Sequence, residues 1–551
     1  MTGFALGVGI DSGLCRVSGA VVDPIGPAPT TDWRNMIRAY GPGNNGALLS
    51  DGTAGTQAQI DAYQNESGAT AAAVRPVLVG WRPVVNAADE LTPSDYTAMV
   101  EIEYPTGSGY QMAAAAMVVA PGASVVAPSF TLATAIPAGA TFNLRTTAVL
   151  ATGQKVPRAG DSSGGNFFRV AGLLSQHARR NVMALGDSIF NNNGQPSRAA
   201  AQGKLPVCQI AIISSTGYQN AANIARRVAL AKALGVTHLL ANYQANDQEA
   251  GRTLAQLQAA VTSIADAFAV EGIRTIWTTA TPRSSAVNQT GSAVTVSGST
   301  TVTLVNAGVA NRYAVGEIYN ITGAATPSRN GFHKITAVTT GTNSITFFDG
   351  TTPDGTDANT VTVNSNYGYL SHQTVSGNRI GGAASIWAQY NAWIKTRPGN
   401  VTDFIAIDEA MAVSVTDPRY KVAPLPPFLR RAKPLLAVSA IPFTNIIAFT
   451  TDGDTYVTQW ATGGRLIWLT GANAGQVVSI NDSANPGQGN LTIALASSAG
   501  VVVGDTFAVQ PPDAQFGQSI DGLHPSAFYT GFGGTPHMQS IIAAKYQAMV
   551  S

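Results

Sequence analysis

Charged residues are scarce in this sequence. Only 11% of its 551 residues are Asp, Glu, Lys or Arg, against about a quarter in an average soluble domain. The net charge is +1 and no basic block is present, so nucleic acid is not an expected partner. The two cysteines, Cys15 and Cys208, match no metal or redox spacing, which excludes a disulfide framework.

Long uninterrupted apolar runs are missing as well. The most apolar stretch, residues 112–140, is broken repeatedly by proline and glycine, so it predicts strands and turns and no membrane span. The first residues lack a basic start followed by an apolar core, and no signal peptide is expected.

Gly, Ala, Thr, Ser and Asn take the place of the missing charges, and their pattern changes along the chain. Alternating apolar runs predict a small β-sandwich. Further on, strand-length apolar runs such as "NVMAL" and "THLLANY" alternate with helical periodicity, which predicts an α/β domain with a parallel sheet covered on both faces. The expected segments are an extended arm at 1–80, the sandwich at 81–151, the α/β domain at 166–285, 366–435 and 513–551, and inserted β modules at 286–365 and 436–512.

The two inserted β modules resemble each other. "GEIYNITGA" (316–324) aligns with "GRLIWLTGA" (464–472), and later strand-like runs follow in the same order. Thr/Gly-rich strands can also look alike through composition alone, so both duplication and chance similarity stay open. Insertions into sheet loops are tolerated, and loops at the carboxyl edge of a parallel sheet surround its ligand site.

Two serines follow Gly-Asp and compete as a nucleophile. Ser162 lies in a formal G-x-S-x-G, but no buried strand precedes it and Gly-Gly-Asn follows, which is typical of a linker. Ser188 follows the apolar run "NVMAL" and Gly186, so it is expected at a sharp turn from a strand into a helix. Gly-Asp-Ser at that place is also an ordinary helix cap, and a partner group has to decide.

His524 in "SIDGLHPSAFY" provides that partner. It is the only one of six histidines with an aspartate, Asp521, three residues before it. We expect Asp521 to orient the His524 imidazole, which serves as the base for Ser188; a surface turn is the plain alternative. An oxyanion hole is expected from the N–H groups of Ser188 and Gly217 and the side chain of Asn246, although Asn246 could instead cap a helix.

With these residues the sequence resembles the SGNH hydrolases, also called the GDSL esterase/lipase family. The blocks "LGDSI", Gly217, "QAND" and "DGLHP" follow in the family's order, with Gln244 where the third block has glycine. The resemblance covers under half of the chain. It implies a three-layer α/β/α domain and ester hydrolysis with catalytic Ser188, Asp521 and His524, an oxyanion hole of Ser188, Gly217 and Asn246, and neither a metal nor a cofactor.

The additional β segments bear on the substrate. Esterases that deacetylate polysaccharides often carry such appendages, and the low charge and β-modular build look like bacteriophage tail fibre proteins. The leading hypothesis is therefore an O-acetyl esterase acting on a surface polysaccharide, located in a virion tail or outside the cell, with tail proteins as partners and homo-oligomerisation left open. Trp460 and Trp468 are candidates for stacking on sugars, although a tryptophan on a strand is more often in the core.

Three other functions compete with this hypothesis. A general carboxylesterase or lipase would use the β domains for attachment, and a non-catalytic receptor-binding tail protein would carry a decayed hydrolase fold. A metal-dependent deacetylase fits least well, because no His/Asp cluster has the spacing of metal ligands.

Overall fold

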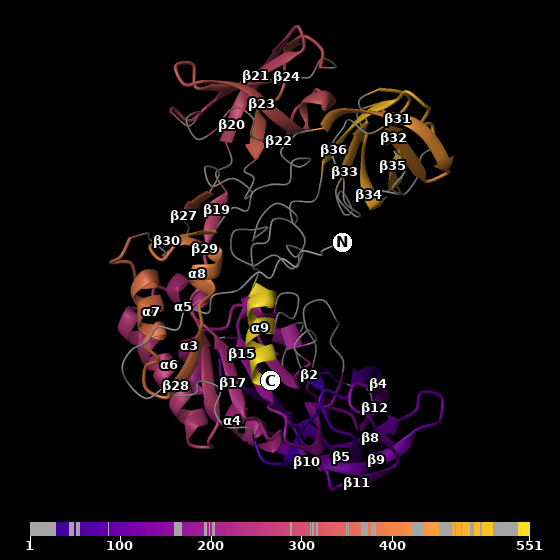
Figure 1. Ribbon diagram of the computed structural model, residues 1–551, viewed down its shortest axis with the longest axis vertical. Coiled ribbons are helices and arrows are strands. Elements are labelled where there is room, and N and C mark those ends of the chain that lie inside the picture. The colour runs from indigo at the N-terminus through magenta and orange to yellow at the C-terminus, as the bar shows by residue number, and fades with distance from the viewer. Residues whose placement is uncertain are drawn as a thin grey trace, which may run out of the picture.

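The computed structural model describes the following residues of the chain: 29–42, 49–50, 55–85, 87–158, 168–191, 196–197, 199–200, 204–286, 289–308, 310, 313, 315, 318–348, 350, 352–364, 373–375, 382–420, 433–450, 465–468, 470–474, 476–484, 490–495, 499–510 and 538–550. These residues form a β-sandwich, an α/β domain and two β modules (Figure 1).

A parallel sheet forms the centre of the α/β domain. Its order is β2-β16-β15-β17-β18-β28, and every neighbouring pair is parallel. The four strands expected between 181 and 280 are all present, because each is an apolar run of strand length between polar turns. The strands span Arg38–Tyr40 (β2), Val182–Gly186 (β15), Val207–Ala211 (β16), His238–Asn242 (β17), Arg274–Thr278 (β18) and Val401–Ile405 (β28).

Alternate side chains of these strands enter two separate cores. Met183 and Leu185 of β15 pack in the core that holds α4, α6 and α7, whereas Val182 and Ala184 pack in the core that holds α1 and α9. Helices therefore cover both faces of the sheet. The helices span Ser188–Asn191 (α1), Gly217–Ala222 (α3), Ile224–Ala233 (α4), Ala245–Glu249 (α5), Leu254–Ala269 (α6), Ile386–Lys395 (α7), Ile407–Met411 (α8) and Met538–Val550 (α9).

The β-sandwich begins earlier in the chain than residue 81. Strands β1, β4 and β5 lie within the segment expected as an extended arm, yet β4 and β5 pair with strands from the sandwich region and β1 pairs with β14. Strand β14, expected in the α/β domain, also pairs here, with β1 and β5. One sheet holds β1 (Asp32–Asn35), β14 (Gly172–His177), β5 (Ala71–Val79), β10 (Ser124–Val126) and β11 (Phe130–Ile136), and the other holds β4 (Gly55–Gln64), β12 (Thr141–Leu150), β8 (Tyr96–Glu103) and β9 (Gln111–Val119).

Three short two-stranded pairs accompany these sheets. Two lie beside the sandwich and one follows α8. They are β3 (Leu49–Ser50) with β13 (Lys155–Val156), β6 (Trp81–Arg82) with β7 (Glu90–Leu91), and β29 (Ala412–Ser414) with β30 (Asp417–Tyr420).

The sandwich and the α/β domain share a core. Val77, Val79 and Trp81 of the sandwich belong to the same buried cluster as Leu230 and Leu234 at α4. Strand β2, which comes from the expected arm, extends the parallel sheet through its pairing with β16. A boundary near residue 166 therefore does not separate two independent units, because the chain crosses between them several times.

The first β module leaves the carboxyl end of β18. Its six main strands form a ring in the order β20-β21-β24-β23-β22-β26, because β26 pairs back to β20. A short strand, β25 (Gly355–Thr356), pairs with β20, and Pro327–Arg329 form a 3-10 turn. Outside the ring, β19 (Ser284–Ala286) pairs with β27 (Gln373–Val375). The ring strands span Gln289–Val296 (β20), Ser299–Leu304 (β21), Ile318–Thr322 (β22), Gly331–Thr339 (β23), Ser344–Phe348 (β24) and Val361–Asn364 (β26).

The second β module is a closed barrel with the same strand order. Its six strands follow β31-β32-β35-β34-β33-β36 and close on β31. Both modules lie beyond the α/β domain from the sandwich (Figure 1). The strands span Lys433–Phe443 (β31), Ile446–Thr450 (β32), Arg465–Trp468 (β33), Val477–Ala484 (β34), Asn490–Leu495 (β35) and Thr506–Gln510 (β36).

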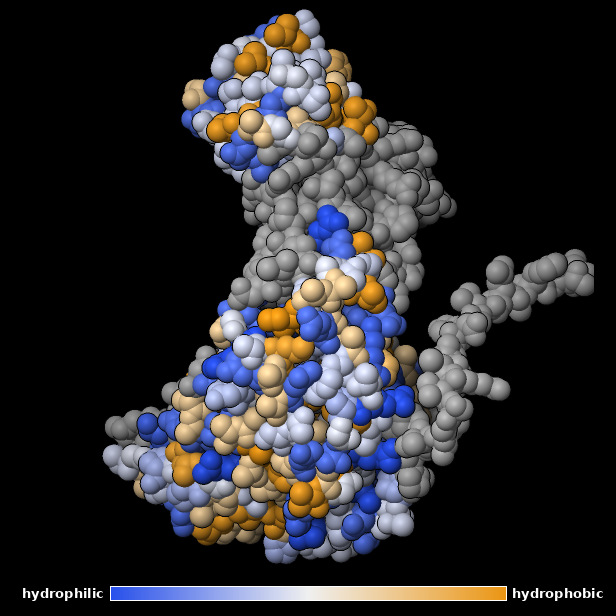
Figure 2. All heavy atoms as spheres, turned by 90° about the vertical axis from the view of Figure 1, so that its left-hand side faces the viewer, coloured by the Kyte–Doolittle hydropathy of each residue, from blue (hydrophilic) through white to orange (hydrophobic). Residues whose placement is uncertain are grey.

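On the face drawn in Figure 2, hydrophilic and hydrophobic residues are interspersed. Among the described residues, no helix combines the length and the apolar character needed to cross a membrane.

Candidate active site at the carboxyl edge of the parallel sheet

Ser188 lies where β15 turns into α1. The strand ends at Gly186, and the Asp187 carboxylate accepts a hydrogen bond from the Ile189 N–H at 2.9 Å, which caps the first turn of the helix. Ser188 itself is 7% exposed, while Asp187 is fully buried. Ser188 thus has the strand–turn–helix position expected from the sequence, at the edge where parallel sheets bind ligands.

The turn before Ser188 requires glycine. A Cβ atom on Gly186 would lie 2.8 Å from the Cβ of Phe190, one turn further along the chain in α1. Real Cβ atoms do not approach other atoms this closely, so any larger residue would push α1 away from the strand. Gly186 therefore sets the distance between Ser188 and the end of β15.

The loop after β16 is attached to this turn. The Ile212 N–H and the Ser215 hydroxyl both donate to the Gly186 carbonyl oxygen, at 3.0 and 3.3 Å. The Asn191 side chain of α1 donates to the Ala211 carbonyl oxygen at 2.6 Å. These three bonds hold the carboxyl ends of β15 and β16 together, close to Ser188.

Gly217, the first expected oxyanion donor beyond Ser188, is already engaged. Its N–H donates to one oxygen of the Asp247 carboxylate at 2.7 Å, and the Tyr218 N–H donates to the other at 3.0 Å. Asp247 therefore caps the start of α3 from the neighbouring helix α5. Burial raises the pKa of Asp247, and the two N–H donors counteract that rise. An oxyanion could use the Gly217 N–H only after this carboxylate had withdrawn.

Asn246 lies in the first turn of α5 and reaches the same loop. Its side-chain N–H₂ group donates to the Ser215 carbonyl oxygen at 2.9 Å, which leaves the second N–H of the amide for another acceptor. The expected alternative, a cap for the helix that follows, is wrong, because Thr253 and Gln256 form the capping box of that helix, α6.

Gln244 has a backbone conformation typical of glycine. Its φ is +149°, although the residue carries a side chain, and it is 1% exposed. Its Nε2 donates to the Thr279 carbonyl oxygen at 3.4 Å. This is the position where the family resemblance expects glycine, so the backbone keeps a shape that costs a non-glycine residue about 1–3 kcal/mol.

One buried cluster at this edge was not singled out from the sequence. The Asp408 carboxylate at the start of α8 accepts from the Thr279 hydroxyl at 2.8 Å and pairs with Lys395 at 2.7 Å. Although burial lowers the pKa of Lys395, its bonds to Asp408 and Glu409 raise it overall. The sequence signal for this cluster is the acidic pair Asp408-Glu409 shortly after strand β28. The cluster joins the ends of β18 and β28.

Several expected site residues lie outside the described part of the chain. These are Asp521 and His524 of the expected triad, the competing serine Ser162, and Trp460. Trp468 is described and is 2% exposed, with its ring 5.6 Å from that of Phe507. It belongs to the core of the second module, so the hypothesis that Trp468 stacks on sugars is wrong.

The described residues contain no group of three or more His, Cys, Asp or Glu side chains that could hold a metal ion. The acidic side chains at the carboxyl edge are instead bound to backbone N–H groups, to Thr279 or to Lys395.

No protein-family model matches the chain, and no curated protein matches it either. Among solved structures it is similar to TesA, with 21% identity over 18% of this chain and 61% of that one, at a TM-score of 0.16. It is similar to the esterase EstA from Pseudoalteromonas sp., with 17% identity over 18% of this chain and 60% of that one, at a TM-score of 0.16. It is also similar to a peptidoglycan O-acetylesterase, with 12% identity over 46% of this chain and 53% of that one, at a TM-score of 0.18.

In each of these three cases the chain spans between about half and three fifths of the solved protein. TM-scores this low assign neither a fold nor an activity to this chain. The solved structures that it is similar to include those of an esterase and a peptidoglycan O-acetylesterase.

Proposed function

We propose that this protein is a serine esterase in which Ser188 is the nucleophile. The observation that carries the proposal is the placement of Ser188 at the strand–turn–helix junction of β15 and α1, with Asn246 and the loop after β16 gathered beside it. A nucleophilic serine needs such a fixed position between a strand and a helix. Within the described residues the Ser188 hydroxyl makes no hydrogen bond.

The proposed mechanism assigns one role to each expected residue. His524 takes the proton of the Ser188 hydroxyl as its oxygen attacks the acyl carbon, and Asp521 orients the imidazole. His524 then returns the proton to the leaving alcohol, and water hydrolyses the acyl-enzyme by the same path. The N–H of Ser188 and the free amide N–H of Asn246 stabilise the oxyanion, and Gly217 joins them when Asp247 moves.

The substrate that we propose is an O-acetylated surface polysaccharide, met by the protein as part of a phage or prophage tail or outside a cell. Two features support this choice. Both β modules emerge from the carboxyl edge of the parallel sheet, where Ser188 lies, and a hydrolase of small esters has no need of them. The low charge of the chain also suits a neutral polymer.

One observation favours a second candidate function. The hydrogen bond from Gly217 to Asp247 occupies an expected oxyanion donor, as would suit a non-catalytic receptor-binding protein with a decayed hydrolase site. A general carboxylesterase is distinguished from the proposed deacetylase by its acyl-chain preference.

The decisive experiment is the hydrolysis of p-nitrophenyl acetate and butyrate by the wild type and by Ser188→Ala, His524→Ala and Asp521→Asn. We expect Ser188→Ala to lower kcat by about 10⁴-fold or more, Ser162→Ala to leave it unchanged, and acetate to be preferred. A loss of activity in Ser162→Ala alone would move the nucleophile to Ser162. A folded wild-type chain that hydrolyses neither ester would favour the receptor-binding protein.

A further inference from the structure

A polar pocket opens beside β2, the edge strand of the parallel sheet, where the sandwich meets the α/β domain. Its volume is about 220 Å³, below the range of about 300–1,000 Å³ typical of drug-sized ligands. We call it the interdomain pocket, and it is lined by Arg38, Tyr40, Asp61, Ala62, Tyr63, Gln64, Arg169 and Ser197.

The interdomain pocket is connected to the Ser188 helix through a single side chain. Gln209 of β16 lies next to Tyr40 in the register of β2 and β16. Its Oε1 accepts from the Ser197 N–H at 3.1 Å, and its Nε2 donates to the Phe190 carbonyl oxygen in α1 at 3.2 Å. In register, Tyr40 lies level with Gln209 and Ala184, so it is two strands away from β15 and four residues before Ser188 along the strand direction.

The charges of the pocket are neutralised within the protein. Arg169 makes a two-pronged pair with Asp61, at 2.9 and 2.8 Å, and Arg38 pairs with Glu66 at 2.9 Å. A charged ligand would have to break one of these pairs, which is costly where the groups are half-buried. The pocket therefore suits a neutral ligand.

The remaining groups suit a ligand with many hydroxyl groups. A carboxylate oxygen can accept more than one hydrogen bond, so Asp61 keeps acceptor capacity after its two-pronged pair with Arg169 has formed. Strand β4, which supplies four of the lining residues, is an edge strand of its sheet, and an edge strand presents backbone donors and acceptors. Tyr40 and Tyr63 are both half-buried and add apolar ring faces beside polar hydroxyls.

We propose that the interdomain pocket binds one neutral sugar unit of a glycan whose ester group reaches Ser188. This inference extends the proposed function, but the binding itself does not depend on catalysis. The pocket would hold the polymer by a ring that is not cleaved, and so would contribute to KM for the polymer and not to the turnover of a small ester.

The test measures glycan binding by the full chain carrying Ser188→Ala, so that no bound ester is consumed. A glycan array of neutral bacterial surface oligosaccharides identifies the ligand, which is then titrated by calorimetry. We expect Tyr63→Ala to weaken its binding by roughly tenfold, since one aromatic contact is removed. Tyr40→Ala is a second variant, which removes the other ring of the pocket from a different strand, and the same loss is expected.

Tyr110→Ala is the matched control, because Tyr110 packs against Arg145 at 4.4 Å. Arg145 is paired with Ile60, next to Asp61 on β4, so it lies on the opposite face of the sheet. Unchanged affinity in both pocket variants would overturn the sugar site, as would the absence of binding by the starting chain to every glycan on the array.

The esterase is tested separately in chains that keep Ser188. There we expect Tyr63→Ala to leave kcat for p-nitrophenyl acetate unchanged. A chain that binds glycan through the pocket but hydrolyses no ester would refute the esterase and retain the sugar site. A chain that hydrolyses esters but binds no glycan would refute the sugar site and retain the esterase.

Discussion

The Asp247 carboxylate holds two backbone N–H groups at the start of α3, those of Gly217 and Tyr218. These donors have no partner within their own helix, because the first turn of any helix leaves its N–H groups unpaired. Asp247 is 1% exposed, so water cannot easily take its place. The residue therefore positions the loop that borders Ser188, apart from any role in chemistry.

Asp247→Ala is expected to lower the free energy of unfolding by about 1–3 kcal/mol, because it leaves buried donors unsatisfied. Asp247→Asn keeps one acceptor oxygen, so its free energy of unfolding should lie between those of the wild type and Asp247→Ala. Urea denaturation measures both values, with Asp95→Ala, at an exposed position, expected to stay within about 0.5 kcal/mol of the wild type. An Asp247→Ala chain as stable as the control would show that solvent or another acceptor replaces the carboxylate.

At the scale of elements, the two β modules share more than their strand order. Gly323 and Gly471 follow equivalent strands, with φ of +83° and +81°. Asp357 accepts from the N–H groups that follow Gly323, and Asp505 lies against Gly471 in the second module. The alignment of "ITGA" with "LTGA" pairs the two glycines, so the likeness of these two segments in sequence has a structural counterpart in this turn.

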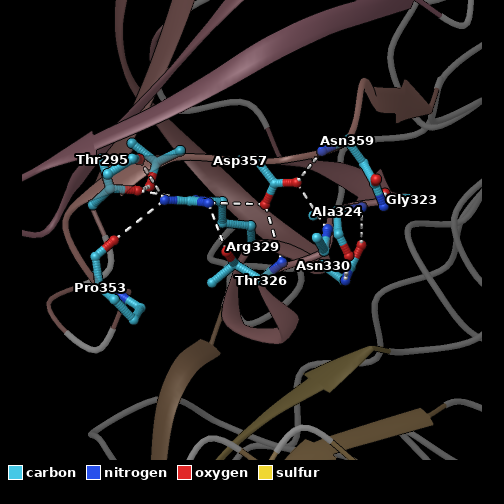
Figure 3. Close-up of polar contacts among 12 residues, drawn as sticks. Thr295, Gly323, Ala324, Thr326, Arg329, Asn330, Pro353, Asp357 and Asn359 are labelled. Atoms are coloured by element: carbon cyan, nitrogen blue, oxygen red, sulfur yellow. Dashed lines mark hydrogen bonds and ion pairs between the residues drawn. The ribbon is translucent and has the colours of Figure 1, made fainter.

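The first module differs in that Arg329 joins this turn. Figure 3 shows its guanidinium directed at Asp357, with Thr295, Thr326 and the Pro353 carbonyl around it. Arg329 and Asp357 lie 2.8 Å apart, and both side chains are almost fully buried. Removing one member of such a pair typically costs about 3–5 kcal/mol, because the other charge stays buried without compensation.

This pair predicts acid sensitivity in the first module. Burial alone would raise the pKa of Asp357, but Arg329 and three backbone N–H donors hold it well below its ordinary value. A depressed pKa in the folded state means that the stabilisation is complete above the pKa of the unfolded chain, about 4, and is lost as the pH falls further. We expect the melting temperature of this module to drop below pH 4 in the wild type.

Calorimetry from pH 2 to 7 measures that drop. Arg329→Met should lower the melting temperature at pH 7 and flatten its dependence on pH, because the Asp357 carboxylate then loses its charge partner. Arg419→Met, which removes a half-buried pair with Asp417 outside the first module, is the control. Equal acid sensitivity in Arg329→Met and the wild type would assign the effect to other carboxylates.

At the scale of the whole molecule, the sandwich and the α/β domain pack against each other through buried contacts. They share the core around Trp81 and Leu234, and the buried Arg227 of α4 pairs with Asp89 at 2.9 Å. The β modules instead have cores of their own. In the first module, Gln289 and Val363 are paired neighbours, so the chain enters and leaves at one place.

We therefore expect the sandwich and the α/β domain to unfold in a single transition that is separate from that of the first module. A chain in which a short Gly/Ser linker replaces residues 289–364 should lose one calorimetric transition and keep the main one within a few degrees. Hydrolysis of p-nitrophenyl acetate should persist in this chain if Ser188 is the nucleophile. A large fall of the main transition would show that the module stabilises the α/β domain.

The local order of the chain determined the elements around Ser188. The apolar run before Gly186 and the helical periodicity after it depend on neighbours a few residues apart, so β15, the turn and the helices α4 and α6 were predictable. The four expected strands of the parallel sheet appear within three residues of their predicted ends. Whether Asp521 and His524 meet Ser188 stays a prediction, since both lie outside the described residues.

Only the tertiary structure decided which elements pair and which donors remain available. Strand β2 has three residues, too few for a pattern, and joins the parallel sheet because β16 offers it an edge. Strand β14 looked like part of the α/β domain but pairs in the sandwich. The Gly217 N–H meets Asp247, 30 residues away, and no local signal predicts that contact. Pairings over such distances depend on the packing of the whole chain, so the sequence of one segment cannot determine them.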